Sequence, residues 1–194
     1  MSAPTLRTTN SSDEVPAIDT IVLAFAADPV ARWCWPESHS YISSMASFTR
    51  AFGGGAFLHN SAYCSDDYAG AALWLPPNVH PEEEAVVEVL ERTVAASIRG
   101  DLFEVFDQMA SYHPGEPHWY LPLIGVDPAH QGKGYGAALM THALQQCDRD
   151  HTPAYLESTN PRNISLYQRH GFEVIGRIQV GGSPPLTPML RQPR

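Results

Sequence analysis

The chain has 194 residues, of which 43% are hydrophobic and 17% charged, a composition typical of one folded domain and too apolar for general disorder. Its formal net charge of −9 arises from 21 acidic residues against 12 Lys and Arg, so non-specific binding to nucleic acid, which needs clustered basic side chains, is not expected. An acidic surface favours solubility, and it also suits a cationic ligand.

Targeting signals are not apparent in the sequence. No apolar run approaches the ~20 residues of a membrane-spanning helix, and the first ten residues lack the basic and apolar regions of a signal peptide. Cys34, Cys64 and Cys147 are odd in number and widely spaced, which is typical of reduced thiols. We therefore expect a cytoplasmic protein, monomeric or homodimeric, that binds neither membranes nor nucleic acid.

A short strand and two helices are predicted at the start of the chain. The strand covers residues 6–8. Ser11 and Glu14 have the spacing of a capping box, and apolar residues at helical spacing follow from Ile18. A second helix is predicted over residues 37–52, where a run of three glycines ends it.

A β-hairpin and two further helices are predicted next. Residues 56–63 and 69–75 have the composition of strands around a polar turn at 65–67. Pro81 suits the first position of a helix, and a separate, shorter helix is predicted to begin at Gly100.

The second half of the sequence alternates strands and helices. The predicted elements are a strand over 119–126, a helix over 134–147, a strand over 154–158, a helix over 162–170, a strand over 172–178 and an edge strand within 180–190. Pro122 is unusual in a strand because it lacks the backbone donor. The order of the elements predicts a mixed α/β sheet with helices on its faces.

The loop after residue 126 carries the strongest functional signal. Gly132, Gly134 and Gly136 alternate between a predicted strand and a predicted helix. Glycines there let backbone N–H groups converge at the positive end of the helix dipole, which suits a diphosphate. A plain tight turn is the alternative. A P-loop fits poorly because Gly136 is followed by Ala137, and the position of the turn, late in the chain, disfavours a dinucleotide-binding fold.

Two motifs resemble those of the GNAT superfamily of acetyltransferases. The run Gln131-Gly132-Lys133-Gly134-Tyr135-Gly136 matches its Gln/Arg-x-x-Gly-x-Gly/Ala signature. Runs that are similar to the segment completing the acetyl-CoA site follow in the family's order: Leu156-Glu157-Ser158, Asn160-Pro161-Arg162-Asn163, Leu166-Tyr167 and Gly171-Phe172. Within the superfamily the sequence is most similar to puromycin N-acetyltransferases, over residues 116–119, 125–136 and 153–172.

The resemblance implies a fold and a division of labour. The GNAT fold has a central, mostly antiparallel sheet that is splayed between its fourth and fifth strands, with helices on both faces. We expect one domain over residues 1–194, with a substrate-side half, 1–115, and an acetyl-CoA-binding half, 116–194.

The resemblance also implies a coenzyme site between the splayed strands. Pantetheine would bond to the strand backbone, the glycine turn would wrap the diphosphate, and Lys133 or Arg162 would meet a further phosphate unless their side chains are simply solvated. The residues implied to bind acetyl-CoA are Ile124, Gly125, Val126, Gln131, Gly132, Lys133, Gly134, Tyr135, Gly136, Ala137, Asn163 and Tyr167. No metal is implied.

Aminolysis of a thioester requires two proton transfers. An ammonium with a pKa of about 10 must lose a proton before it attacks, and the departing thiolate must be protonated. Tyr167 stands where the family's tyrosine acts as that acid, one helical turn after Asn163, and a packing role is its alternative. Glu157 is the candidate base or amine-orienting carboxylate, unless it is only an exposed residue at a strand end. Trp119 and Glu157 are the candidate substrate-binding residues.

Three side chains before the strand at 119–126 are weaker candidates for the base. These are His113, Glu116 and His118. Their spacing does not match a known metal site well, so metal catalysis is not expected.

We therefore expect transfer of the acetyl group of acetyl-CoA to a primary amine of a small molecule, by direct attack in a ternary complex. The alternatives are acetylation of protein N-termini or lysines, a non-catalytic acyl-CoA sensor and a metal-dependent hydrolase. Aromatic side chains of the substrate-side half either line a pocket or pack the core: Trp33, Trp35, Tyr41 and Trp74.

Overall fold

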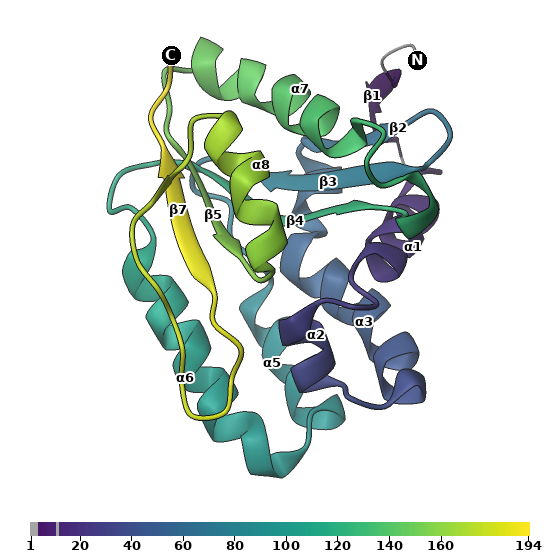
Figure 1. Cartoon of the computed structure of the whole chain (residues 1–194), viewed down its shortest axis with the longest axis vertical. Helices are drawn as coiled ribbons and strands as arrows, with labels where there is room; N and C mark the ends of the chain where they lie inside the picture. The colour runs from purple at the N-terminus through teal and green to yellow at the C-terminus, as the bar shows by residue number, and fades with distance from the viewer. Residues whose placement is uncertain (1–3, 11) are drawn as a thin grey trace.

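A seven-stranded sheet runs through the part of the chain that the computed structural model describes, residues 4–10 and 12–194 (Figure 1). Its strand order is β1-β2-β3-β4-β5-β7-β6, and every neighbouring pair is antiparallel except β4 and β5. The strands are β1 (Leu6–Thr8), β2 (Ala62–Ser65), β3 (Gly70–Leu75), β4 (Trp119–Val126), β5 (Ala154–Ser158), β6 (Glu173–Val174) and β7 (Thr187–Arg191). The predicted mixed, mostly antiparallel α/β sheet is confirmed.

Helices cover both faces of this sheet (Figure 1). They are α1 (Glu14–Ala24), α2 (Pro29–Cys34), α3 (Ser38–Gly53), α4 (Gly55–Leu58), α5 (Glu83–Thr93), α6 (Ala96–Tyr112), α7 (Tyr135–Arg149) and α8 (Ile164–Arg169), with 3-10 turns at Pro128–His130 and Pro161–Asn163. Strand β3 alternates between the two cores, because side chains of a strand point to opposite faces in turn. Ala71, Leu73 and Leu75 belong to the core that includes residues of α1, α3, α5 and α6, whereas Ala72 and Trp74 belong to the core that includes residues of α7 and α8.

The sheet is splayed between β4 and β5. Only two residue pairs join these parallel strands, Trp119 with Ala154 and Tyr120 with Tyr155. Beyond Tyr120 the strands separate, although β4 stays paired with β3 to its end. The predicted splay between the fourth and fifth strands is therefore present, and it opens the sheet on the side of the glycine turn.

Pro122 lies at a β-bulge just beyond the last pair of β4 with β5. Leu73 of β3 pairs with Leu123, but Leu75 pairs with Tyr120, so two residues of β4 lie opposite one residue of β3. A bulge interrupts the ladder of hydrogen bonds, and the missing N–H of proline is tolerated there.

The first helix starts differently from the prediction. It begins at Glu14 with Asp13 at the N-cap position, and Asp13 makes no side-chain cap. Instead, its carboxylate accepts hydrogen bonds from the Arg7 guanidinium and from the Asn10 backbone. The predicted capping residue, Ser11, lies outside the described residues.

Two predictions for residues 1–115 are wrong, both of them near glycines. Residues 56–63 do not form one strand, because the chain makes a further helical turn, α4, before β2 begins at Ala62. Gly100 does not start a helix either: α6 begins at Ala96 and runs through it. Glycine costs an exposed helix about 1 kcal/mol, and the packing of α6 through Leu102, Val105 and Met109 outweighs this.

The C-terminal segment is also corrected. The strand predicted over 172–178 shrinks to Glu173–Val174, and β7 is an interior strand between β5 and β6 instead of an edge. Its last residue, Arg191, is buried and donates two hydrogen bonds of 2.8 Å to Asp148 on α7. That ion pair fixes the end of β7 to the helix that follows the glycine turn.

Candidate active site

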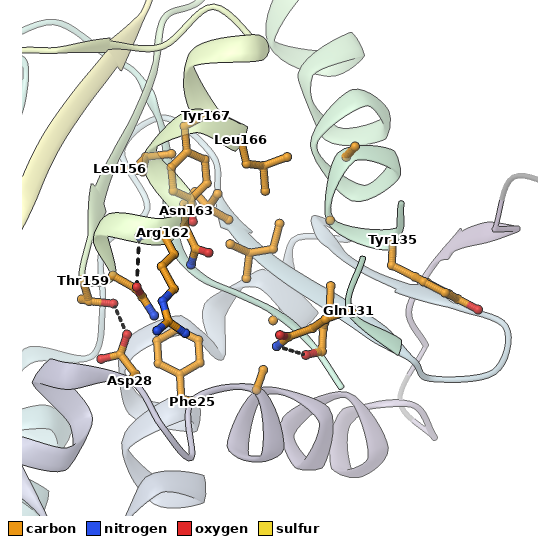
Figure 2. Close-up of a pocket in the computed structure, with 18 of the residues that line it drawn as sticks. Phe25, Asp28, Gln131, Tyr135, Leu156, Thr159, Arg162, Asn163, Leu166 and Tyr167 are labelled. Atoms are coloured by element: carbon orange, nitrogen blue, oxygen red, sulfur yellow. Dashed lines mark hydrogen bonds between the residues drawn. The ribbon is translucent and has the colours of Figure 1, made fainter. Parts of the chain in front are cut away.

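The splay between β4 and β5 opens into a cleft of about 570 Å³. Its walls come from β4, β5, the glycine turn, the start of α7, helix α8 and the segment between α1 and α2. Figure 2 shows Gln131 from the turn and Asn163 and Tyr167 from the opposite wall around this space, with Phe25 and Asp28 along one side. Segments from both halves of the chain therefore meet at one cavity.

Two glycines of the turn have backbone conformations that favour glycine. Gly132 has φ of +74°, and Gly134, the N-cap of α7, has φ of +91°. A Cβ atom at either residue would meet no atom within 4 Å, and both residues line the cleft. The turn is thus an open cradle at the N-terminus of a 15-residue helix, where free backbone N–H groups and the helix dipole attract an anion.

Two other glycines allow close packing around the cleft. A Cβ at Gly125 would lie 2.5 Å from the Cβ of Ala24, so only glycine lets β4 approach α1 this closely. A Cβ at Gly136 would lie 3.3 Å from Leu166 of α8. Both residues line the cleft, and each has a packing requirement besides any contact with a ligand.

The other residues predicted to bind acetyl-CoA fall into two groups. Those that line the cleft are Ile124, Val126, Gln131, Tyr135, Ala137, Asn163 and Tyr167, with Arg162 beside them. Lys133 is not among the lining residues, and its ammonium donates to the Ala129 carbonyl at 2.9 Å. The Tyr135 side chain points away from the cleft and donates to Asp67 at 2.7 Å, so only the rest of that residue faces the cavity (Figure 2).

Tyr167 lies on α8 with 5% of its surface exposed. Its ring packs against Phe172 with the ring centroids 6.3 Å apart, while the residue lines the cleft. Burial, with a smaller contribution from the negative charge of Asp28, raises the pKa of the Tyr167 phenol above its ordinary value of 10. The hydroxyl is therefore held in its protonated form, which is the form that a general acid needs.

Glu157 lies on β5, where the strand has separated from β4, and it lines the same cleft. Its side chain is only 3% exposed, so it is not the exposed strand-end residue that was one alternative. The Tyr120 hydroxyl donates to one carboxylate oxygen at 2.9 Å, and His113 lies 3.4 Å from the other. Burial and the charge of Glu157 raise the pKa of Tyr120 well above 10.

Trp119, predicted as a substrate-binding residue, is placed elsewhere. It is buried in the core under α7, and its indole N–H donates to Asp150 at 3.2 Å. It is not one of the residues that line the cleft, because it occupies the first position of β4, where β4 and β5 are still paired.

Asp28 is a site residue that the sequence analysis did not single out. It caps the short helix α2 by accepting hydrogen bonds from the backbone of Val30 and Ala31, and it accepts a 2.6 Å hydrogen bond from Thr159 (Figure 2). Burial raises its pKa. The sequence signal was Asp28-Pro29, an N-cap followed by proline at the first helical position, which predicts a helix start.

A second, apolar cavity of about 80 Å³ adjoins the cleft. The two share Phe25, Asp28, Pro122 and Thr159 as lining residues. The rest of the apolar cavity is formed mainly by large side chains, including Trp35, Met45, Phe48, Phe52, Phe106 and Met109. Of the four aromatic residues considered from the sequence, Trp35 is therefore the one that lines it.

Of the remaining candidate bases, His113 lies beside Glu157 and contacts His118 at 3.0 Å. Glu116 contacts His118 through its backbone carbonyl. Across residues 4–10 and 12–194, no group of three or more His, Cys, Asp or Glu side chains is arranged to hold a metal ion. No helix in that same part of the chain is long and apolar enough to cross a membrane.

Comparison with known proteins agrees with this architecture. The sequence model of the Acetyltransferase (GNAT) family matches residues 32–172. An uncharacterised N-acetyltransferase of Schizosaccharomyces pombe is 28% identical over an alignment of 142 residues that covers 66% of this chain and 58% of that protein. The chain thus spans little more than half the length of that relative.

Two solved structures are similar over nearly their whole length. A protein described as histone acetyltransferase HPA2 and related acetyltransferase, from Corynebacterium glutamicum, has a TM-score of 0.70 at 24% identity, covering 100% of this chain and 98% of that one. The polyamine N-acetyltransferase of Drosophila melanogaster has a TM-score of 0.69 at 14% identity, covering 98% and 100%. These likenesses show the fold, and the family match covers more than half of the sequence. The chain belongs to the GNAT family of acetyltransferases.

Proposed function

We propose that this protein transfers the acetyl group of acetyl-CoA to a primary amine of a small molecule, by direct attack in a ternary complex. The observation that carries the proposal is the convergence on one cleft of an open glycine cradle, a buried carboxylate and a buried tyrosine. These three features meet the three needs of the reaction: a site for a diphosphate, a proton acceptor and a proton donor.

The residues around the splay fit acetyl-CoA. The cradle at Gly132 and Gly134 leaves room where a Cβ would otherwise intrude, and the helix dipole of α7 favours the negative charge of a diphosphate. The backbone of residues 124–126 would hold the pantetheine, and Arg162 would meet a further phosphate. When bound, acetyl-CoA supplies the acetyl group as an activated thioester.

Glu157 is the proposed acceptor of the ammonium proton. It is buried, so its charge is little screened by water, and a neighbouring cation is attracted strongly. Tyr120 holds one carboxylate oxygen by its 2.9 Å hydrogen bond and so fixes the orientation of the group. The Glu157 carboxylate would first orient the ammonium and then remove its proton, leaving a neutral amine to attack.

Tyr167 is the proposed donor of a proton to the departing sulfur. We expect Tyr167→Phe to lower kcat about 10²-fold, because the phenol proton is lost while the ring remains, and to leave the Kd of acetyl-CoA nearly unchanged. Because burial raises the Tyr167 pKa above 10, the wild-type rate should not fall through loss of this proton at or below pH 10. Initial rates of CoA release from pH 6 to pH 10 measure both the loss of kcat in Tyr167→Phe and the pH dependence of the wild-type rate.

The matched control for this substitution is Tyr63→Phe. Tyr63 is buried in the same core but does not line the cleft. It should keep the wild-type kcat. If Tyr167→Phe also keeps the wild-type kcat, Tyr167 only packs α8 against the sheet, and the sulfur is protonated by another group.

The apolar cavity beside the cleft supports the proposed substrate class. A volume of about 80 Å³ lined by aromatic and Met side chains suits a compact apolar or aromatic group. Asp28 lies where this cavity meets the cleft, and a bound cation would stabilise its charged form against the effect of burial. The likeness to puromycin N-acetyltransferases and the polyamine substrate named for the Drosophila protein also favour a small amine. In this scheme residues 1–115 build most of the substrate side and residues 116–194 build the acetyl-CoA side.

Asp28→Asn tests the proposed cation contact. Asparagine keeps one oxygen for the α2 cap, so the helix start should survive, whereas the charge and the oxygen that accepts from Thr159 are lost. We expect the KM of a cationic amine to rise about tenfold with a small change in kcat, as for a lost charge-assisted contact in the ground state. The KM of an arylamine that is uncharged at the assay pH should not change. Asp19→Asn, an exposed carboxylate on α1, is the control. Equal KM values for wild type and Asp28→Asn would show that Asp28 only caps α2.

Acetylation of proteins is the second candidate, favoured by the description of the Corynebacterium glutamicum structure as a histone acetyltransferase and related acetyltransferase. The two candidates differ in their preferred acceptor. Competition at equal concentrations among puromycin-like aminonucleosides, arylalkylamines, polyamines, lysine peptides and N-terminal peptides distinguishes them. We expect a small amine to give the highest kcat/KM. A tenfold preference for a peptide would replace the small-molecule proposal.

A further inference from the structure

A chain of polar side chains leads from the base of the cleft towards the surface. Oε1 of the buried Glu157 lies 3.4 Å from Nε2 of His113. Among the described residues this oxygen has no hydrogen-bond partner. Nδ1 of His113 lies 3.0 Å from Nε2 of His118. Nδ1 of His118 lies 2.8 Å from the backbone carbonyl of the exposed residue Glu116. His113 and His118 are both partly exposed, so the chain runs from a buried carboxylate to groups that meet water.

The contacts of the two imidazoles fix where their protons lie. A carbonyl oxygen only accepts, so Nδ1 of His118 carries a proton. In the neutral ring Nε2 of His118 is then an acceptor, and Nδ1 of His113 donates to it. Nε2 of His113 is left facing Glu157. With Glu157 ionised and both rings neutral, Nε2 of His113 carries no proton and can accept one from Glu157.

The proposed reaction must dispose of one proton in each turnover. An ammonium and a thioester give an amide, a thiol and one proton, so a base inside a cleft must be emptied before the next cycle. We propose that His113 and His118 form a relay that carries the ammonium proton from Glu157 to solvent. This inference rests on the proposed function, in which Glu157 removes that proton.

The relay balances at every step. Glu157 takes a proton from the ammonium and releases it from Oε1 to Nε2 of His113. His113 passes its Nδ1 proton to Nε2 of His118, and His118 gives its own Nδ1 proton to water. Exchange of the two partly exposed imidazoles with water then restores the starting tautomers, and one proton has left the protein.

The surroundings of the relay keep its rings in place. The His113 ring packs against the rings of Tyr120 and Tyr155, whose centroids lie 4.6 Å and 4.4 Å from its own. The titratable groups that face the two histidines are these tyrosines, Glu157 and His80. Burial lowers the pKa of His118, with further lowering by the nearby His113 and His80, so a proton that reaches this ring is readily released.

Rescue experiments test the relay. We expect His113→Gln to lower kcat about 10- to 100-fold, within the range for a positioned proton-transfer group, while the Kd of acetyl-CoA is unchanged. Added imidazole should restore most of this rate in a saturable manner. His118→Gln should lower kcat about tenfold, and the rate should recover as the buffer concentration is raised. His39→Gln, an exposed histidine on α3, should match wild type under all conditions.

Each contrary result has a separate meaning. If His113→Gln loses activity and imidazole does not restore it, His113 has only a packing role and the relay is overturned. Wild-type rates in either His113→Gln or His118→Gln would also overturn the relay. If Glu157→Gln keeps its activity, or wild type acetylates no amine, the proposed function itself fails. An independent readout without turnover is imidazole ¹⁵N NMR of the resting protein: the relay requires a proton on Nδ1 of both histidines, and the Nε2–H tautomer at His113 or His118 would overturn it.

Discussion

Gly134→Val is expected to lower the affinity for acetyl-CoA by about 10³-fold, a loss of about 4 kcal/mol in binding free energy. Two effects act together. The residue has φ of +91°, a conformation that costs a β-branched side chain of order 1–3 kcal/mol, and its Cβ would project into the open cradle. Titration calorimetry of the purified variant with acetyl-CoA measures the loss.

Two further variants separate the steric effect from backbone strain. Gly134→Asn tolerates positive φ better than valine but still fills the cradle, so it should also bind weakly. Gly100→Ala adds a Cβ that meets nothing within 4 Å, inside a helix and away from the cleft, and should bind normally. Normal acetyl-CoA affinity in a folded Gly134→Val protein would exclude the glycine turn as the diphosphate site.

Glu157→Gln is expected to lower kcat about 10³-fold at neutral pH. The amide keeps the shape of the side chain and can still accept from Tyr120, but it cannot take up a proton from the ammonium. Acetyl-CoA binding should be unchanged, because the proposed cradle lies on the turn before α7. Single-turnover assays with saturating amine separate the chemical step from binding.

Glu173→Gln is the control for Glu157→Gln. It also removes a strand carboxylate, but one that is exposed on β6. It should retain the wild-type kcat. If Glu157→Gln is as active as Glu173→Gln, Glu157 is not the base, and Asp28 is the next carboxylate to test.

Much of the proposed coenzyme side could be predicted from sequence because its signals are local. The glycine spacing at 132, 134 and 136 sets a turn before a helix, and the structure has that turn at the N-terminus of α7. The strands at 119–126 and 154–158 were predicted with their observed bounds because they are apolar runs between turn residues.

The proposed substrate side was less predictable because its features depend on distant segments. The apolar cavity needs residues from α2, α3, α5 and α6 to meet below β4, and no local pattern indicates that meeting. Asp28 lines the cleft, and its carboxylate accepts a 2.6 Å hydrogen bond from Thr159, a residue far along the chain. The position of Trp119 was not predictable for the same reason. It lies beside the predicted site in the sequence, but its side chain packs in the core with residues of α7.

The ion pair of Arg191 with Asp148 is another feature that depends on residues far apart in the sequence. A polar, proline-rich C-terminal segment suggested an edge strand. In the structure β7 lies between β5 and β6, and the Arg191 guanidinium at its end donates to Asp148 and to the His170 carbonyl. Burial of a charged residue requires a partner that the sequence alone does not identify.

The most direct test of the central claim is acetyl transfer itself. Purified protein is incubated with acetyl-CoA and the panel of small amines and peptides, while CoA release is followed with a thiol reagent and acetylated products are identified by mass spectrometry. We predict CoA release that depends on a small primary amine, with equal amounts of N-acetylated product, and no change on adding a chelator. Tight binding of acetyl-CoA without acetylation of any small amine would contradict the proposal.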